Sequence, residues 1–252
     1  MSAFDTLLQQ AIHTPGLLGP DFSLDEERKQ FDKGLPPPGP SLLLSLPPIS
    51  ARAIQMIVTF EVTSEAAYNR LYTHPIWPHG SSGVTIGIGY DCGYVTAEAF
   101  AKDWTEAIGA AAVSMLKVAC GKTGAAASQI LGQVQAVSVP YDAAYRVFKQ
   151  TDIPRYTART LGALPSAAAQ LSPDCLGALV SLVFNRGASF NAHGDRYREM
   201  NAIRDDIASQ KLADIPSQIR AMKRLWQGNP AMVGLLKRRD LEAQLFQEGL
   251  QT

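Results

Sequence analysis

The sequence predicts a mainly α-helical fold of the α+β class, with a helical bundle around a buried central helix and a small β-hairpin lobe. Apolar residues recur at helical spacing through most of the chain after Thr96. The segment 175–184 is apolar on nearly every side, as a buried helix would be. By contrast, GVTIGIGYD at residues 83–91 alternates apolar with small or polar residues, which is typical of a strand.

The composition is that of a globular protein large enough to bury a core. The 252 residues are 46% hydrophobic and 18% charged, and the formal net charge is zero. Zero net charge provides no electrostatic reason to expect nucleic acid or an anionic membrane as a partner. No segment reaches the roughly 18 apolar residues of a membrane span, and the N-terminus lacks the pattern of a secretory signal.

The three cysteines, Cys92, Cys120 and Cys175, are far apart in the sequence and lack the spacing of metal ligands. Their odd number argues against a disulfide framework. We expect them to be small buried apolar residues.

Residues 1–49 differ from the rest and are predicted to be a Pro-rich N-terminal extension to a main domain at 50–252. They hold eight of the 16 prolines, including PPPGP at 36–40, and an acidic run at 25–27. We expect extended chain, with a short helix at 3–12. Leucines at 42–44 and at 46 suggest that part of it packs on the main domain. It is either an ordered extension or a segment for docking or export.

The next helix should begin after Ser50, a favourable N-cap residue. Ile54, Ile57, Val58 and Glu61 then fall on one helical stripe. A carboxyl group on that stripe is partly shielded from water, which favours its protonated form unless a cation or hydrogen-bond donors compensate. This is the environment of a general acid, although a Glu held by a buried Arg for structure alone would show the same spacing.

Residues 68–80 mix aromatic residues, prolines and His, which predicts an irregular loop or a short hairpin whose aromatics either stack on sugar rings or simply pack. In the strand that follows, alternation places Ile86, Ile88 and Tyr90 on a core face. The opposite face carries Thr85, Gly87, Gly89 and Asp91. Two alternate glycines let a ligand approach the backbone closely, or they allow tight packing inside the protein.

The remaining elements are predicted to be helices. The first is capped by Thr96, carries Phe100, Trp104, Ile108, Ala111 and Met115, and ends near Gly121. Shorter helices are expected at 125–135 and 140–150. The central helix starts at Ser172-Pro173-Asp174 and ends at Gly187. Further helices are marked by Met200, Ile203 and Ile207, by Ile219, Met222, Leu225 and Trp226, and by the segment 232–248.

Three places in this pattern resemble the phage-type lysozymes (glycoside hydrolase family 24) and the wider lysozyme-like superfamily. The first is TFE, ending at Glu61 and followed by the TIGIG strand at 85–89. The second is the apolar helix that ends in LVSLVFNRG at 179–187. The third is LKRRDLEAQLF at 236–246. The resemblance spans residues 50–250 and implies a lysozyme-like fold.

The resemblance also implies an activity, hydrolysis of the β-1,4 bond between N-acetylmuramic acid and N-acetylglucosamine in peptidoglycan. Glu61 then matches the general acid, and Thr85 matches the Thr close to that acid. Substrate-binding residues are expected on the hairpin and at the end of the central helix: Gly87, Gly89, Tyr90, His79 and Asn185. Asn185 is equally suited to capping its helix.

One departure from the family concerns the second catalytic group. The family usually has an Asp shortly before the matched Thr, where this chain has His79, or His74 if the preceding aromatic is aligned. Asp91 is one replacement, although a straight strand would put it about 20 Å from Thr85. Glu65 is another if the helix of Glu61 continues. Alternatively there is no second carboxylate, and Thr85 orients the water, with or without His79.

His74 and His79 lack the further ligands of a metal site, so we expect no metal and no cofactor.

Arg238 and Arg239 either pair with Glu61 or are surface charges. The open alternatives to a muramidase are a chitinase or chitosanase on the same fold and a non-catalytic module that binds glycan or a partner.

The expected partner is the peptidoglycan glycan strand, acted on by a monomer. Without a signal peptide, the protein would be made in the cytoplasm and reach the periplasm or cell wall after export or lysis. It would then be an antibacterial effector, with an immunity protein or a secretion-machine component as a further partner, or a phage endolysin.

Overall fold

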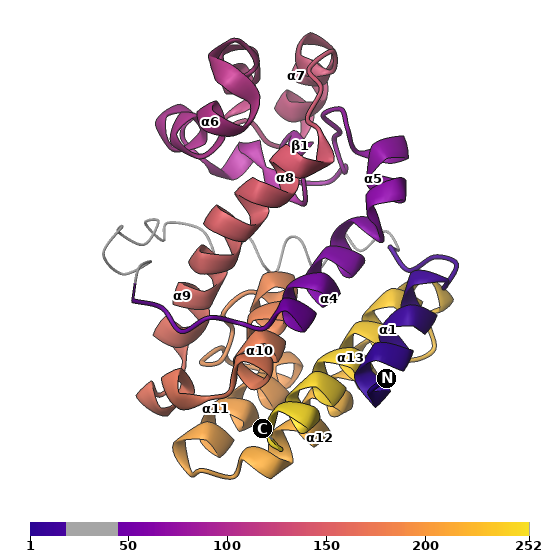
Figure 1. The fold of residues 1–252 in the computed structure, drawn as a ribbon, viewed down its shortest axis with the longest axis vertical. Helices are drawn as coiled ribbons and strands as arrows, with labels where there is room; N and C mark the ends of the chain where they lie inside the picture. The colour runs from indigo at the N-terminus through magenta and orange to yellow at the C-terminus, as the bar shows by residue number, and fades with distance from the viewer. Residues whose placement is uncertain (19–44, 252) are drawn as a thin grey trace. The chain divides into compact units, whose positions relative to one another are not determined.

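The computed structural model describes residues 1–18 and 45–251. The predictions for the PPPGP stretch, the acidic run and the leucines at 42–44 lie outside these residues. The chain divides into two compact units (Figure 1). We call Met1–Phe60 together with Pro154–Thr252 the discontinuous unit, and Glu61–Ile153 the inserted unit.

The discontinuous unit is built from helices that pack along α13 (Val233–Gly249). Figure 1 shows α1 (Ala3–Ile12), α10 (Pro173–Arg186) and α12 (Ile215–Ala221) beside it. Most of α4 (Ala51–Val62), most of α9 (Ile153–Ala163) and α11 (Arg198–Ala208) complete the unit. All residues of α10 from Cys175 to Phe184 are buried, which confirms the predicted central helix.

Local sequence signals define the ends of these helices. Ser172 accepts a hydrogen bond from the Cys175 amide at 3.3 Å, and α10 ends where Gly187 adopts φ 71°. Helix α1 begins with a capping box in which Ser2 and Asp5 each accept the other's amide hydrogen bond. Caps of this kind stabilise a helix by about 1 kcal/mol each, and both helices have the limits that the sequence predicts.

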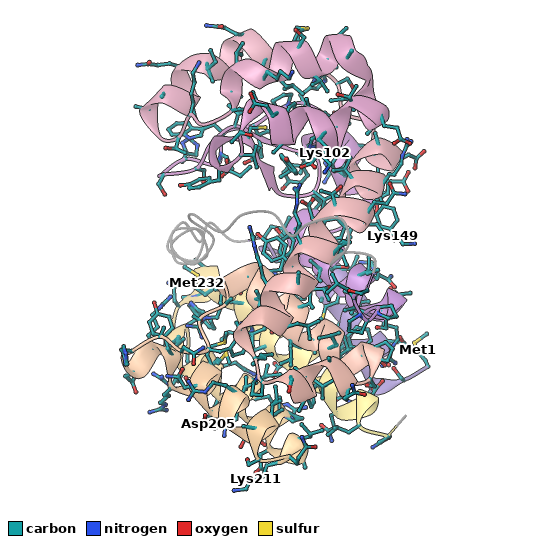
Figure 2. All side chains as sticks on the ribbon, turned by 90° about the vertical axis from the view of Figure 1, so that its left-hand side faces the viewer. Met1, Lys102, Lys149, Asp205, Lys211 and Met232 are labelled. Carbon is teal, nitrogen blue, oxygen red and sulfur yellow. The ribbon has the colours of Figure 1, made fainter. Side chains whose placement is uncertain are left out.

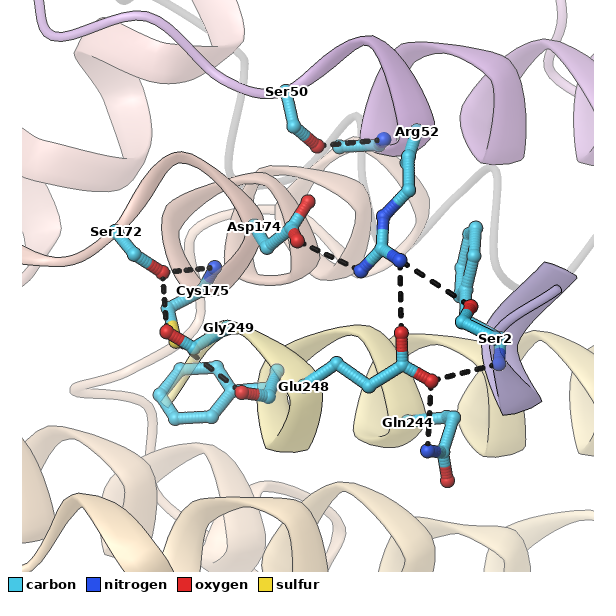
Figure 3. Close-up of polar contacts among 12 residues, drawn as sticks. Ser2, Ser50, Arg52, Ser172, Asp174, Cys175, Gln244, Glu248 and Gly249 are labelled. Atoms are coloured by element: carbon cyan, nitrogen blue, oxygen red, sulfur yellow. Dashed lines mark hydrogen bonds and ion pairs between the residues drawn. The ribbon is translucent and has the colours of Figure 1, made fainter. Parts of the chain in front are cut away.

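An ion-pair cluster joins four of these helices (Figure 3). Arg52 of α4 donates to Asp174 of α10 at 2.7 Å and to Glu248 of α13 at 2.8 Å. Glu248 also accepts the amide hydrogen bond of Phe4 in α1 at 2.8 Å. The first and last described helices of the chain are therefore held together by one glutamate.

The inserted unit contains the end of α4, α5 (Glu65–Leu71), α6 (Ala97–Leu116), α7 (Ala125–Val134) and α8 (Tyr141–Val147), which a π-helical segment (Phe148–Asp152) continues. It also holds the small sheet. Strand β1 (Thr85–Ile86) pairs antiparallel with β2 (Tyr90–Asp91). A mainly helical fold with a small antiparallel hairpin is therefore confirmed.

Helix α6 differs from its predicted register. Gly109 has φ 81° and ψ 157°, so the helix is kinked there. Phe100 and Trp104, before the kink, are buried as predicted. After it, Met115 is exposed and Val113 and Leu116 are buried instead, because the kink changes which face of the helix meets the core. The helical spacing that relates Met115 to Phe100 and Trp104 in the sequence therefore does not place Met115 in the core.

Charged side chains lie mainly on the surface of each unit. Lys102 and Lys149 are exposed on the inserted unit, and Asp205 and Lys211 on the discontinuous unit (Figure 2). Across 1–18 and 45–251, no helix combines the length and the apolar character needed to cross a membrane.

Candidate active site

Glu61 lies at the end of α4, one residue before the helix stops. The stripe that leads to it is buried, with Ile57 0% and Val58 7% exposed. Glu61 itself is half-buried. The helix ends because Thr63 adopts φ 64°, a left-handed conformation that does not continue an α-helix. The carboxyl group is thus placed at the boundary of an apolar face.

The Glu61 carboxylate lies directly against the backbone of Gly89. A Cβ on Gly89 would be 3.2 Å from Glu61 Oε2 and 4.0 Å from its Cδ. No side chain on residue 89 separates the acid from the hairpin, and the φ of 74° at Gly89 also requires glycine. The predicted acid and the predicted glycine face do meet, at this one residue.

The segment 85–91 is a tight hairpin, and the prediction of one straight strand is wrong. Gly87 and Gly89 have φ 60° and 74°, which reverses the chain between them. Thr85 pairs with Asp91 across the hairpin, and Ile86 pairs with Tyr90. The separation of about 20 Å that a straight strand would give Thr85 and Asp91 does not apply, because the two residues lie opposite each other across the hairpin.

Two of the expected substrate contacts face the protein interior. A Cβ on Gly87 would be 2.7 Å from the ring of Trp104, so protein fills the space beside this glycine. Tyr90 is 5% exposed, packs edge-on against Trp104 and donates a hydrogen bond to Asp103 at 2.7 Å. Gly87 and Tyr90 thus form part of the core of the inserted unit. That they contact substrate stays a prediction.

Asp91 organises the base of the hairpin. Its carboxylate accepts hydrogen bonds from the Gly83 amide at 3.0 and 3.1 Å and from the Gly93 amide at 2.9 Å. A Cβ on Gly83 would be 2.2 Å from Asp91 Oδ1, so this contact needs glycine as well. Both carboxylate oxygens are engaged in holding the backbone, which is a structural role.

The other candidates for the second catalytic role are placed as follows. Glu65 is an exposed residue in the first turn of α5. Because Thr63 breaks α4, Glu65 does not continue the helix of Glu61, as that hypothesis required. His79 is exposed, has φ 78° and lies 4.6 Å from Trp77 between ring centroids. The His74 ring hydrogen-bonds the Val137 carbonyl at 3.1 Å.

A cluster of four tyrosines was not anticipated from the sequence. The ring centroids are 6.4 Å apart for Tyr68 and Tyr72, 5.4 Å for Tyr68 and Tyr141, and 5.9 Å for Tyr141 and Tyr145. Tyr68 is buried and donates to the Val139 carbonyl at 2.9 Å, and the other three are half-buried. Two i, i+4 pairs, 68 with 72 and 141 with 145, are the sequence signal that could have revealed this tyrosine cluster.

Tyr72 links this cluster electrostatically to the acid. Burial raises the pKa of Tyr72, and the negative charge of Glu61 raises it further. The side chain of Tyr72 is therefore a phenol at neutral pH, with an O–H that can donate a hydrogen bond. A half-buried aromatic ring and a carboxyl group are thus neighbours in the inserted unit.

Arg238 and Arg239 are buried in the discontinuous unit, so the alternative of surface charges is wrong. Both form ion pairs with the buried Glu242, at 3.3 and 2.8 Å. Arg239 also donates to Asn185 at 3.0 Å. These bonds tie the end of the central helix to α13, and they give Asn185 a defined partner within its own unit.

Among the residues that the structure describes, no three His, Cys, Asp or Glu side chains gather in a way that could hold a metal ion.

One comparison with known proteins finds a match, which covers part of the chain. A family model described as Domain of unknown function (DUF8812) matches residues 56–157. This range contains the whole inserted unit, with Glu61, the hairpin and the tyrosine cluster, together with the second half of α4. No curated protein matches the chain.

Proposed function

We propose that the protein is a peptidoglycan hydrolase with a lysozyme-like fold, a muramidase that cleaves the β-1,4 bond between N-acetylmuramic acid and N-acetylglucosamine. The observation that carries this proposal is the contact between the Glu61 carboxylate and the bare backbone of Gly89. A helix-terminal acid beside a glycine hairpin is the arrangement that the resemblance to phage-type lysozymes implies. The segments TFE and TIGIG supply it in this chain.

Glu61 acts as the general acid in this proposal. It donates its proton to the glycosidic oxygen as the bond to the anomeric carbon breaks, and positive charge develops on that carbon. Water then adds its oxygen to the anomeric carbon and releases a proton to solvent. A half-buried carboxyl group suits this role because limited solvation favours the protonated form, which is the form that a general acid needs.

Thr85 is the residue that we propose to orient the attacking water. It pairs with Asp91 in the same hairpin whose turn contains Gly89, the residue that contacts the acid. Its hydroxyl can hydrogen-bond a water molecule as donor or acceptor. Asp91 takes no part in the proposed chemistry, because its oxygens hold the backbone of Gly83 and Gly93.

The tyrosine cluster is proposed as a platform for the sugar rings. Tyr72, Tyr141 and Tyr145 are half-buried, so each of these residues keeps some surface exposed. Aromatic rings combine a large apolar face with a polar edge, which matches the apolar face and hydroxyl rim of a sugar. Tyr72 lies close enough to Glu61 to be affected by its charge, so the platform begins beside the acid.

Substitution of the acid tests the proposal directly. Glu61→Gln keeps the shape of the side chain and removes its proton, so release of reducing ends from purified peptidoglycan should fall by about 100-fold or more. Glu65→Gln, an exposed change nearby in sequence, should keep wild-type activity. Full activity of Glu61→Gln would overturn the proposal. Parallel assays on chitin oligomers determine whether the substrate must contain N-acetylmuramic acid.

The second candidate is a non-catalytic module that binds glycan. It is favoured by one observation, the engagement of the Asp91 carboxylate with backbone amides. Under this alternative the wild type sediments with purified cell walls and releases no reducing ends, and Glu61→Gln sediments equally well.

The proposed activity also implies a setting. A wall hydrolase made in the cytoplasm has to reach the periplasm or cell wall through export or cell lysis. An exported antibacterial enzyme would be paired with an immunity protein in the producing cell, whereas a phage endolysin would be released by lysis.

A further inference from the structure

Cys92 and Cys120 are brought together in the inserted unit, although 28 positions separate them in the sequence. Cys92 begins the short 3₁₀ turn η1 (Cys92–Tyr94) that follows β2. Cys120 follows the 3₁₀ turn η2 (Lys117–Ala119) at the end of α6. The two turns pack on each other.

A backbone hydrogen bond brings the chain segments of the two cysteines together. The Gly121 amide, next to Cys120, donates a hydrogen bond to the Cys92 carbonyl at 3.1 Å. With standard bond lengths and bond angles this limits the Cα–Cα distance of the two cysteines to at most about 8 Å. Disulfides join Cα atoms that are usually about 4.4 to 6.8 Å apart.

The same two segments are also in contact one residue further along. A Cβ on Gly93 would be 2.6 Å from the Lys122 carbonyl oxygen and 2.7 Å from Thr123 Cγ2. Two successive contacts hold the segments in register, so their approach is not a single accidental contact. Gly121, with φ 72° and no heavy atom within 4 Å of a Cβ placed there, leaves the backbone beside Cys120 room to adjust.

The two thiols differ in accessibility. Cys92 is fully buried and Cys120 is half-buried. Burial raises the pKa of Cys92 well above its usual value, and the charge of a Cys120 thiolate raises it further. Burial also raises the pKa of Cys120, to about 11. The reaction of either thiol with a disulfide oxidant is therefore slow at neutral pH. It becomes faster as the pH rises, because the thiolate is the nucleophile.

We propose that Cys92 and Cys120 form an intramolecular disulfide when the protein meets a small-molecule disulfide oxidant. The Cys120 thiolate attacks one sulfur of oxidised glutathione, forms a mixed disulfide and releases one glutathione thiolate. The Cys92 thiolate then attacks the Cys120 sulfur and releases the second. The protein loses two protons and two electrons, and oxidised glutathione becomes two reduced molecules. This site is independent of the proposed hydrolase activity.

The cross-link would fix the glycine hairpin to the loop after α6. Cys92 follows Asp91 directly and is three residues from Gly89, the residue that contacts Glu61. Closing the loop from 92 to 120 restricts the unfolded chain, so the midpoint of thermal unfolding should rise by roughly 5 to 10 °C. A reducing agent should reverse this rise.

Intact-mass measurement on the full chain tests the proposal. Wild type incubated with oxidised glutathione at about pH 8.5 and then alkylated under denaturing conditions should lose two hydrogens and take up one alkyl group, at Cys175. Proteolysis should give one peptide pair that joins Cys92 to Cys120.

Two variants serve as controls. Cys175→Ser removes a cysteine of the other unit, whose thiol donates to the Phe246 carbonyl, and should form the cross-link as wild type does. Cys120→Ala, a change at a half-buried position, should abolish both the cross-link and the thermal shift. The proposal is overturned if wild type carries only a glutathione adduct on Cys120 with Cys92 still free, or if no cysteine reacts.

Discussion

At the scale of single residues, Gly89 is constrained both by its backbone and by its neighbour. Its φ is 74°, and Glu61 Oε2 lies 3.2 Å from the position of an added Cβ. Gly89→Ala should therefore destabilise the protein by about 1 to 2 kcal/mol through its backbone conformation. It should also displace the acid, and a misplacement of about 1 Å lowers kcat by roughly 100-fold. Steady-state hydrolysis of purified peptidoglycan and denaturant unfolding measure the two effects separately.

Gly121→Ala is the matched control for this change. Gly121 has nearly the same backbone conformation, φ 72°, and a Cβ there would meet no heavy atom within 4 Å. The two alanine variants should lose similar stability, and only Gly89→Ala should lose activity. Equal kcat values for the two variants would show that the contact with Glu61 has no role in catalysis.

At the scale of elements, the hairpin depends on Asp91. The carboxylate accepts from the amides of Gly83 and Gly93, and an asparagine can offer only one oxygen to them. Asp91→Asn should lower the free energy of unfolding by about 1 to 3 kcal/mol, because an NH2 group would replace Oδ2 and place a donor against the Gly83 N–H. Urea titration followed by circular dichroism measures this. A variant of wild-type stability that had lost all activity would instead assign Asp91 to the catalytic machinery.

The helices were predictable because their signals are local. Ser172, Pro173 and Gly187 set the limits of α10 through contacts within a few residues of each end. The stripe that ends at Glu61 follows from helical geometry alone. The kink at Gly109 was not predicted, because an isolated glycine in a helical pattern is compatible with a continuous helix.

The hairpin was predictable only in part. Both a straight strand and a two-stranded hairpin bury Ile86 and Tyr90. The alternation of apolar residues in the sequence is therefore compatible with either structure. The chain forms a hairpin because Gly87 and Gly89 adopt positive φ. A glycine in the sequence permits that conformation without requiring it. The hydrogen-bond partners of Asp91 were not predictable either. They are backbone amides, and the pattern of side chains in the sequence does not identify which amides will bind the carboxylate.

At the scale of the whole molecule, stability should depend on pH through two glutamates of the discontinuous unit. Burial raises the pKa of Glu199, but hydrogen bonds from Arg224 and Arg198 outweigh it, and the net pKa lies below the usual value. Glu248 behaves in the same way, with burial opposed by the Phe4 amide, Gln244 and Arg52. A lowered pKa contributes stability above the unfolded-state pKa of about 4.3, and this contribution is lost as pH falls through the folded-state value.

The urea midpoint should therefore fall as pH drops from about 5 to about 3. Glu248→Gln should be less stable than wild type at neutral pH and should lose less on acidification, so the two curves approach each other at low pH. Glu106→Gln, an exposed change on α6, should follow the wild-type curve. A constant difference between Glu248→Gln and wild type at every pH would contradict the role assigned to this carboxylate.

The insertion of one unit within another determines the order in which the chain can fold during synthesis. The inserted unit is continuous and can form once Ile153 has emerged from the ribosome, whereas α1 needs α13, and the hydrogen bond from Phe4 to Glu248 spans 244 residues. Synthesis proceeds at about 5 to 20 residues per second. The apolar side of α1, with Phe4 and Leu8, therefore stays without its partner α13 for roughly 5 to 20 s after the inserted unit has been synthesised. We expect chaperones to bind a nascent chain in this state, because the apolar side of α1 is exposed.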